Sequence, residues 1–246
     1  MTDRLAIDLY AGDGDFNFQA VVDAGPQWSL FALKLSQGTY YTGSPWAERM
    51  YPGARRALGD RYGVDGFRVP YHYLDVGVDG SAQASFFLKR LEACGGIGHG
   101  DPFVMLDVER SGQRRTMTRK QIVDCALAWV VATHAATGLR TVIYGGEYLR
   151  ENGIKVAELG CEYAWVADYE AKLRPTHYTD LGVDIAHLVA WQYGGLEGDG
   201  HEEAHLEGYP STSPAGPCDL SAITLAGGGE AAIAELHSWC VRSMTD

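Results

Sequence analysis

Two carboxylic acids, Asp107 and Glu109, stand two residues apart at the end of an apolar run, in the segment PFVMLDVER from Pro102 to Arg110. Side chains at positions i and i+2 of a β-strand project from the same face, so the two acids share a face if the run is a strand. Burial of two carboxyls is costly unless other groups compensate. Closely spaced carboxyls can divide the roles of proton donor and carboxylate, because each opposes ionisation of the other. The alternative is a structural ion pair, for example with Arg110, or a capping role.

Three further acids stand at the boundaries of other apolar runs. Asp8 closes AID, Asp168 follows YAWVA, and Asp219 opens CDLSAI. Aromatic residues occupy the same run ends: Tyr10, Tyr71, His72, Tyr73, Tyr144, Trp165, Tyr169, Trp191 and Tyr193. Sugars stack their C–H faces on rings and bond their hydroxyls to carboxylates, so this combination suits a carbohydrate. For each ring taken alone, ordinary core packing is the alternative.

Short β-like runs alternate with helical stretches along the chain. The predicted strands are Leu5 to Leu9, Leu30 to Leu35, Gly66 to His72, Pro102 to Val108, Thr141 to Tyr144, Tyr163 to Val166, Leu188 to Gln192 and Cys218 to Ile223. The predicted helices between the first five strands are Phe18 to Ala24, Trp46 to Leu58, Ser81 to Ala93 and Thr118 to Thr137. Beyond Gly145 the helices become short, apart from a C-terminal helix over 229–243. This pattern predicts an α/β fold, a TIM-like barrel of eight strands with about five principal helices, in a single domain over 1–246.

The alternation within the fourth run assigns its two faces. Val104, Leu106 and Val108 form an all-apolar face, which is expected to pack under the helices. The face of Asp107 and Glu109 is expected to line the barrel interior. The acids then stand at the carboxyl end of the strand, where barrel enzymes have their active sites.

Composition excludes several classes of protein. With 246 residues, 46% of them hydrophobic, the chain can form one large domain with a full core. No stretch approaches the roughly 18 apolar residues of a membrane span, and the start MTDRLAIDLY does not resemble a signal peptide, so a soluble protein is predicted. The net charge of -12 argues against a nucleic-acid partner. No C-x-x-C pair is present, and buried free thiols are predicted for Cys94, Cys125, Cys161, Cys218 and Cys240.

Eight motifs follow one another at the predicted strands: AIDLY, FALKLSQG, VPYHYL, LDVE, TVIYGG, WVADY, VAWQY and CDLSAI. In this order they resemble the glycoside hydrolase family 25 lysozymes, known from phage endolysins and from secreted bacterial and fungal muramidases, over about Leu5 to Ile223. The resemblance implies a flattened barrel of the (β/α)5(β)3 type. It also implies hydrolysis of the β-1,4 bond between N-acetylmuramic acid and N-acetylglucosamine in bacterial peptidoglycan. Glu109 is the implied general acid, and Asp8, Asp107 and Asp219 are implied to complete the acidic site.

Three places at the rim of this site depart from the usual family pattern. The stretch AGDGDFNF stands where a Trp is usual after the first Asp, Gln37 precedes Gly38 where Glu is usual, and Ser221 stands where Asn is usual. These changes bear on the detailed substrate. Since all four acids are present, catalysis is still expected.

Glycoside cleavage needs a protonated acid beside the leaving oxygen and negative charge near the anomeric carbon. Glu109 is predicted to hold that proton. Asp107 either stabilises the positive charge or orients the acetamido group of the substrate, so an assisted retaining route and an inverting route with water both stay open. No metal or cofactor is expected. The residues predicted to contact substrate are Lys34, Tyr71, His72, Tyr144, Trp165, Asp168, Trp191 and Gln192.

Two other classes of function stay open. His201, Glu202 and His205 spell HEEAH, which matches the zinc-protease motif H-E-x-x-H, but the flanks are rich in helix breakers. We therefore expect a chance match in a long loop over 194–217. A non-catalytic wall-binding module would lack one of the acids, and none is missing. The acidic chain fits a phage lysin made in the host cytoplasm, and equally a part of a virion or of a secreted machine.

Overall fold

A computed structural model describes residues 4–110, 117–168, 173–194 and 219–242. Eight strands close into a barrel in the order of the chain. They are β1 (Leu5–Leu9), β2 (Trp28–Gln37), β3 (Phe67–Tyr73), β4 (Phe103–Asp107), β5 (Arg140–Gly145), β6 (Tyr163–Ala167), β7 (Leu188–Gly194) and β8 (Asp219–Ile223). Neighbours from β1 to β7 are parallel, whereas β8 runs antiparallel to both β7 and β1. The predicted eight-stranded barrel is confirmed, and its last strand closes it in the reverse direction.

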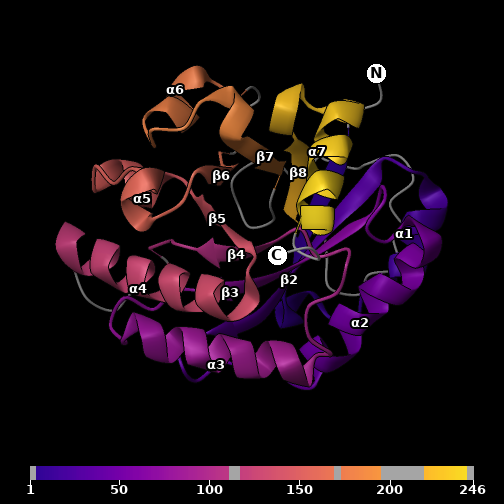
Figure 1. Cartoon of the computed structure of the whole chain (residues 1–246), viewed down its shortest axis with the longest axis horizontal. Helices are drawn as coiled ribbons and strands as arrows, with labels where there is room; N and C mark the ends of the chain where they lie inside the picture. Colours follow the sequence, from indigo (N-terminus) through magenta and orange to yellow (C-terminus); the bar gives the residue numbers. More distant parts are fainter. Residues whose placement is uncertain (1–3, 111–116, 169–172, 195–218, 243–246) are drawn as a thin grey trace.

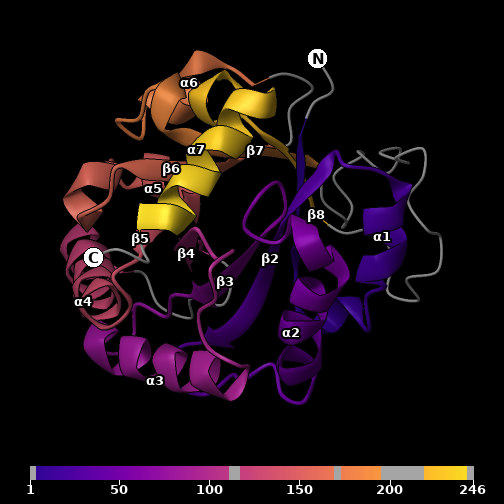
Figure 2. The same ribbon diagram turned by 45° about the vertical axis from the view of Figure 1, so that its right-hand side comes forward.

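Four helices accompany the first half of the barrel: α1 (Phe18–Ala24), α2 (Trp46–Leu58), α3 (Gly80–Ala93) and α4 (Arg119–Thr137). They form an arc around the strands in Figures 1 and 2. Thr118 caps α4 by accepting a hydrogen bond from the backbone N–H of Gln121, and Gly138 ends the helix in the left-handed conformation. The next two helices, α5 (Glu147–Glu151) and α6 (Pro175–Thr179), have five residues each. Among the described residues, the longer helices therefore belong to the first four crossovers and to the C-terminal segment, as predicted.

The strands have two apolar faces because they are buried on both sides. In β4, Phe103 and Met105 belong to the cluster inside the barrel, whereas Val104, Leu106 and Val108 belong to the layer under the helices. All five are at most 1% exposed. The alternation predicted for this strand is confirmed, and it fixes Asp107 on the interior face.

The C-terminal helix α7 (Gly229–Arg242) packs against the amino-terminal ends of the strands and lies in front of the barrel in Figure 1. Its Trp239 meets the rings of Phe103 and Tyr163 edge to face, and the guanidinium of Arg140 lies 4.7 Å from the Trp239 ring. These three partners stand at or near the first residues of β4, β6 and β5. Helix α7 thus closes the end of the barrel opposite to the acids.

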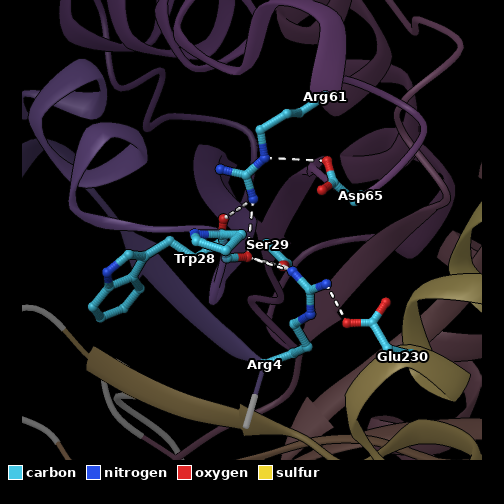
Figure 3. A network of polar contacts seen from close by, with 7 residues as sticks. Arg4, Trp28, Ser29, Arg61, Asp65 and Glu230 are labelled. Carbon is cyan, nitrogen blue, oxygen red and sulfur yellow. Dashed lines mark hydrogen bonds and ion pairs between the residues drawn. The ribbon is translucent and has the colours of Figure 1, made fainter. Parts of the chain in front are cut away.

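An arginine ties this end together (Figure 3). Arg4, just before β1, forms an ion pair with Glu230 of α7 at 2.5 Å. The other side of its guanidinium donates to the Ser29 hydroxyl at 3.2 Å and to the Pro26 carbonyl. Arg61 donates to the same Pro26 carbonyl at 3.0 Å. The starts of β1 and β2 are therefore joined to α7 by charge-assisted hydrogen bonds.

Every predicted strand is present, with ends that differ by at most two residues. The C-terminal helix ends at Arg242 rather than at residue 243, and the predicted loop over 194–217 lies almost wholly outside the described residues. Four cysteines are buried free thiols, as predicted, and Cys218 lies outside the description. No described helix is both long enough and apolar enough to cross a membrane.

Candidate active site

A cavity of about 180 Å³ opens at the carboxyl ends of β1 to β5. Its walls are Asp8, Tyr10, Lys34, Tyr71, Tyr73, Met105, Asp107, Glu109 and Tyr144. The structure thus brings together three of the four acids singled out in the sequence. The backbone of the fourth, Asp219, pairs with that of Asp8 across β8 and β1, and its side chain lies outside the description.

The two acids of the LDVE motif reach the cavity from one strand. Asp107 is the last residue of β4 and only 6% exposed. Its carbonyl accepts a hydrogen bond from the backbone N–H of Leu74, and the N–H of Val108 donates to the carbonyl of Tyr144, both at 2.9 Å. The chain leaving β4 is therefore held by the neighbouring strand ends on both sides, which fixes the direction of Glu109.

Lys34 contributes a positive charge to the same cavity. Burial lowers the pKa of Lys34, and the nearby charges of Asp107, Glu109 and Asp8 oppose that shift. Burial raises the pKa of Glu109, and the charge of Lys34 opposes it. The environment therefore favours the protonated form of Glu109, which is the form that a general acid requires.

A second cavity, of about 360 Å³, also borders Glu109. It is lined by Glu109, Arg110, Gly146, Glu147, Tyr148, Arg150, Ala167 and Asp168. Tyr148 and Arg150, on α5, were not predicted as site residues. Their place in the chain, directly after β5, could have indicated them, because segments after barrel strands border the active site. Glu109 is therefore a wall residue of both cavities.

Asp168 follows β6 and belongs to the second cavity rather than to the acid cavity. Its carboxylate lies 2.8 Å from Nδ1 of His177 and 3.7 Å from Nη2 of Arg150. The indole N–H of Trp191 donates to the Asp168 carbonyl at 2.7 Å. Trp191 therefore orients the Asp168 segment and lines neither of the two cavities.

His72 does not face either cavity, in contrast to the sequence-based expectation. It points outward from β3, is fully buried, and stacks on the ring of Trp129 in α4. Its two ring nitrogens are held by the Ser36 hydroxyl at 2.8 Å and the Gln83 side chain at 3.1 Å. Burial lowers the pKa of His72 to about 4. The ring is thus a neutral core group, because its inward neighbours Tyr71 and Tyr73 take the two positions that face the site, and the expected substrate contact is not retained.

Trp165 and Gln192 are also fully buried and line neither cavity. The indole N–H of Trp165 donates to the Ser221 hydroxyl at 2.9 Å, and its ring meets that of Tyr144 edge to face. The Gln192 carbonyl accepts from the N–H of Asp168 at 3.0 Å. Both residues therefore support groups that do face a cavity, and their expected contact with substrate is not retained.

Two exposed tyrosines lie beside the acid cavity: Tyr10 lines it, and the Tyr40 hydroxyl accepts a hydrogen bond at 3.1 Å from Gln37, which contacts Lys34. Tyr10 is 47% exposed and Tyr40 is 62% exposed. The Tyr10 N–H donates to the carboxylate of Asp13 at 2.7 Å, and burial raises the pKa of Asp13 to about 6. Tyr40 was missed in the sequence, although it follows the end of β2 within the segment QGTYYTG. Exposed rings at a cavity edge are suited to stacking on sugar faces.

Within the described ranges no group of three or more His, Cys, Asp or Glu side chains is arranged to hold a metal ion. The HEEAH segment lies outside those ranges.

A barrel with carboxyl groups gathered at the carboxyl ends of its strands is an arrangement typical of glycoside hydrolases. The family "Glycosyl hydrolases family 25" matches residues 7–197, and the chain belongs to this family. It is therefore a glycoside hydrolase. A search of the curated proteins found no match.

Three solved structures illustrate the similarity of the fold. A muramidase from Acremonium alcalophilum is 20% identical, with a TM-score of 0.70, over 96% of this chain and 98% of the other. The catalytic domain of endolysin ply40 from bacteriophage P40 of Listeria monocytogenes is 18% identical, with a TM-score of 0.61, over 96% and 97%. The modular autolysin LytC from Streptococcus pneumoniae, solved with a synthetic peptidoglycan ligand, is 14% identical, with a TM-score of 0.62, over 89% of this chain and 46% of LytC.

Proposed function

We propose that the protein is a lysozyme of the muramidase type, which hydrolyses the β-1,4 bond between N-acetylmuramic acid and N-acetylglucosamine in bacterial peptidoglycan. Family membership supports glycoside chemistry, and the similar muramidase, endolysin and peptidoglycan-bound autolysin support the substrate class. The proposal rests above all on one observation. Asp8, Asp107 and Glu109 line one cavity, and Glu109 alone of the three also borders the second cavity.

Glu109 is the proposed general acid. Its place in the walls of both cavities suits a scissile bond that lies beside its carboxyl group. The proton passes from the Glu109 carboxyl to the leaving oxygen as the bond to the anomeric carbon breaks. Because burial raises its pKa, Glu109 keeps this proton to a higher pH than an exposed glutamate does.

Asp107 is proposed to act on the sugar that keeps the anomeric carbon. It holds the acetamido group of that sugar, whose oxygen attacks the anomeric carbon as the leaving oxygen departs. Water then reopens the resulting ring, and the Glu109 carboxylate takes up the proton of that water. Asp8 and Asp219 complete the negative site. Tyr71, Tyr144 and Lys34 contact the sugar in the acid cavity, while Asp168 serves the second cavity.

The test of the acid is Glu109→Gln, which keeps the volume and removes the transferable proton. The rate on purified peptidoglycan is expected to fall by about 10²- to 10⁴-fold. Asp107→Asn is expected to be similarly severe, and Asp8→Asn and Asp219→Asn less so. The matched control is Glu92→Gln on the exposed face of α3, which should act at the wild-type rate. Near-full activity of a folded Glu109→Gln variant contradicts the assignment.

The bond and the route are tested by mass analysis of the released fragments. New reducing ends are expected on N-acetylmuramic acid, and de-N-acetylated wall should be cut much more slowly because its amine cannot attack as an acetamido oxygen does. Reducing ends on N-acetylglucosamine would rule out a muramidase and leave a glycosidase. Equal rates on both walls would favour an activated water instead.

A further inference from the structure

We propose that Lys34 is a positioning residue that sets the charge of the acid cavity: it holds Asp107 and Asp8 ionised, while burial keeps the proton on Glu109. We further propose that the neutral side chain of Gln37, which stands where the family usually has Glu, leaves the charge of Lys34 undivided in this chain. The inference rests on the proposed function in one respect, namely that Glu109 must carry a proton to act.

The backbone of β2 brings Lys34 and Gln37 to the same face. Residues three apart on a regular strand point to opposite faces. In the register between β2 and β3, Lys34 pairs with Tyr71 and Gln37 pairs with Tyr73, with an irregularity between Lys34 and Ser36. Such a bulge adds one residue to one strand and reverses the alternation beyond it. Gln37 therefore turns toward the same end of the barrel as Lys34.

The ammonium group of Lys34 is held at a defined place. Its Nζ donates to Oε1 of Gln37 at 3.0 Å and lies 4.4 Å from the ring centroid of Tyr73 and 5.4 Å from that of Tyr41. Contacts with ring faces stabilise a cation that has lost part of its water. None of these partners carries a negative charge. The charge of Lys34 is thus available to the carboxyl groups that share the cavity.

The titratable groups that face Lys34 come from several strands. Asp8 belongs to β1 and Asp107 is the last residue of β4, and Glu109 follows Asp107 by two residues. The remaining facing groups are phenols: Tyr10, Tyr41, Tyr71, Tyr73 and Tyr144. His72 lies on the other face of β3 and is neutral. Among the described side chains of the cavity wall, Lys34 is the one cation.

Lys34 acts on three acids, because Asp107, Glu109 and Asp8 line the same cavity. A neighbouring cation favours the ionised form of a carboxyl. For Glu109 the effect of burial outweighs that of Lys34. The cation therefore keeps Asp107 as the carboxylate, whereas burial leaves Glu109 as the protonated partner.

Gln37 is the second half of the argument, because a carboxylate in its place would stand 3.0 Å from the ammonium group and pair with it. A pair of that kind would withdraw the charge of Lys34 from Asp107. The isosteric change Gln37→Glu is thus a probe of the mechanism that leaves Lys34 itself intact. Gln37→Leu removes the same hydrogen bond without adding a charge.

The experiment follows the carboxyl carbons of Asp107 and Glu109 by NMR across a pH titration, together with the pH dependence of kcat and KM on peptidoglycan. In Lys34→Met the titration of Asp107 is expected to move to higher pH, and both limbs of the pH–rate profile should move upward by about one pH unit. Lys34→Arg should restore the wild-type profile. Gln37→Glu should move it in the same direction as Lys34→Met, and Gln37→Leu should not. Lys89→Met, which removes an exposed lysine of α3, is the matched control.

The outcomes separate this proposal from the proposed function. If wild type cleaves peptidoglycan but the carboxyl titrations of Lys34→Met and Gln37→Glu equal those of wild type, Lys34 does not set the charge and the proposal is overturned. It is also overturned if Lys34→Met lowers the thermal stability and reduces the activity by the same factor at every pH, because that result indicates a structural role alone. If the titrations move as expected while no glycan is cleaved, the charge assignment stands and the proposed function fails.

Discussion

Replacement of Asp101 by Asn is expected to lower the free energy of unfolding by about 3–5 kcal/mol. Asp101 is fully buried and forms a two-pronged ion pair with Arg68 of β3, with Nε–Oδ1 and Nη2–Oδ2 distances of 2.9 and 2.7 Å. Its Oδ1 also accepts from the Tyr62 hydroxyl at 2.7 Å. Its Oδ2 accepts from the Tyr51 hydroxyl at 3.0 Å and from the N–H of Gly98 at 2.7 Å. Each of these contacts brings a donor to the carboxylate.

The expected magnitude follows from this geometry. An asparagine amide has the same shape but presents an NH₂ donor in place of one oxygen, so donors face donors whichever way the amide turns. The guanidinium of Arg68, with its side chain 2% exposed, is left without a counter-charge. A buried charge that loses its partner costs about 3–5 kcal/mol, whereas an exposed pair contributes less than about 1 kcal/mol. Lys120 and Asp124, with side chains 82% and 60% exposed, form such an exposed pair.

Urea unfolding near neutral pH, followed by tryptophan fluorescence, measures these differences. Asp124→Asn is the control and should cost less than about 0.5 kcal/mol. The double variant Arg68→Met/Asp101→Leu removes both charges and should be more stable than Asp101→Asn alone. A loss below about 1 kcal/mol for Asp101→Asn would refute the reasoning. A double variant no more stable than the single one would show that shape, and not the unpaired charge, decides the cost.

Two further predictions concern pH and metal. The pKa of His72 is lowered from 6.5 to about 4 in the folded state, so the stability of the neutral ring is fully present above pH 6.5 and is lost as the pH falls toward 4. The total loss is roughly 3 kcal/mol, and urea unfolding should give a flatter dependence on pH for His72→Gln than for wild type. Lytic activity should survive EDTA, and His201→Ala should act at close to the wild-type rate, because carboxyl chemistry needs no metal. Stoichiometric zinc in the protein, with activity lost on chelation, would favour the protease instead.

The sequence was most informative where chemistry interrupts an apolar pattern. In β4 the alternation assigned Asp107 and Glu109 to the face of Met105, and the structure has them in one cavity. The interruption is informative because burial of an acid costs free energy unless other groups compensate, whereas burial of another apolar residue does not. The same logic brought Asp8 to this cavity from β1, although the two segments lie about a hundred residues apart in the printed sequence.

The faces of β3 could not be assigned in this way. A strand buried on both sides reads as a continuous buried run, and VPYHYL offers large rings at successive positions without a polar contrast. His72 was therefore expected at the site beside Tyr71, but it belongs to the opposite face, where Ser36 and Gln83 satisfy its nitrogens. The parity of the strand decides the matter, because Tyr71 and Tyr73 both line the cavity and the residue between them must point away.

The place of Gln37 depends on a different kind of information. Counting from Lys34 by twos puts Gln37 on the opposite face, and only the irregularity before Ser36 brings it back. The segment LKLSQ contains no glycine that would indicate a bulge, so the bulge could not be predicted from the local sequence. Its cause lies in the partner strand: Ser36 pairs with His72 at full burial and bonds to its ring, which requires Ser36 to face outward. The outward anchoring of His72 thus turns Gln37 toward Lys34, and through Gln37 a buried core histidine bears on the charge proposed for the site.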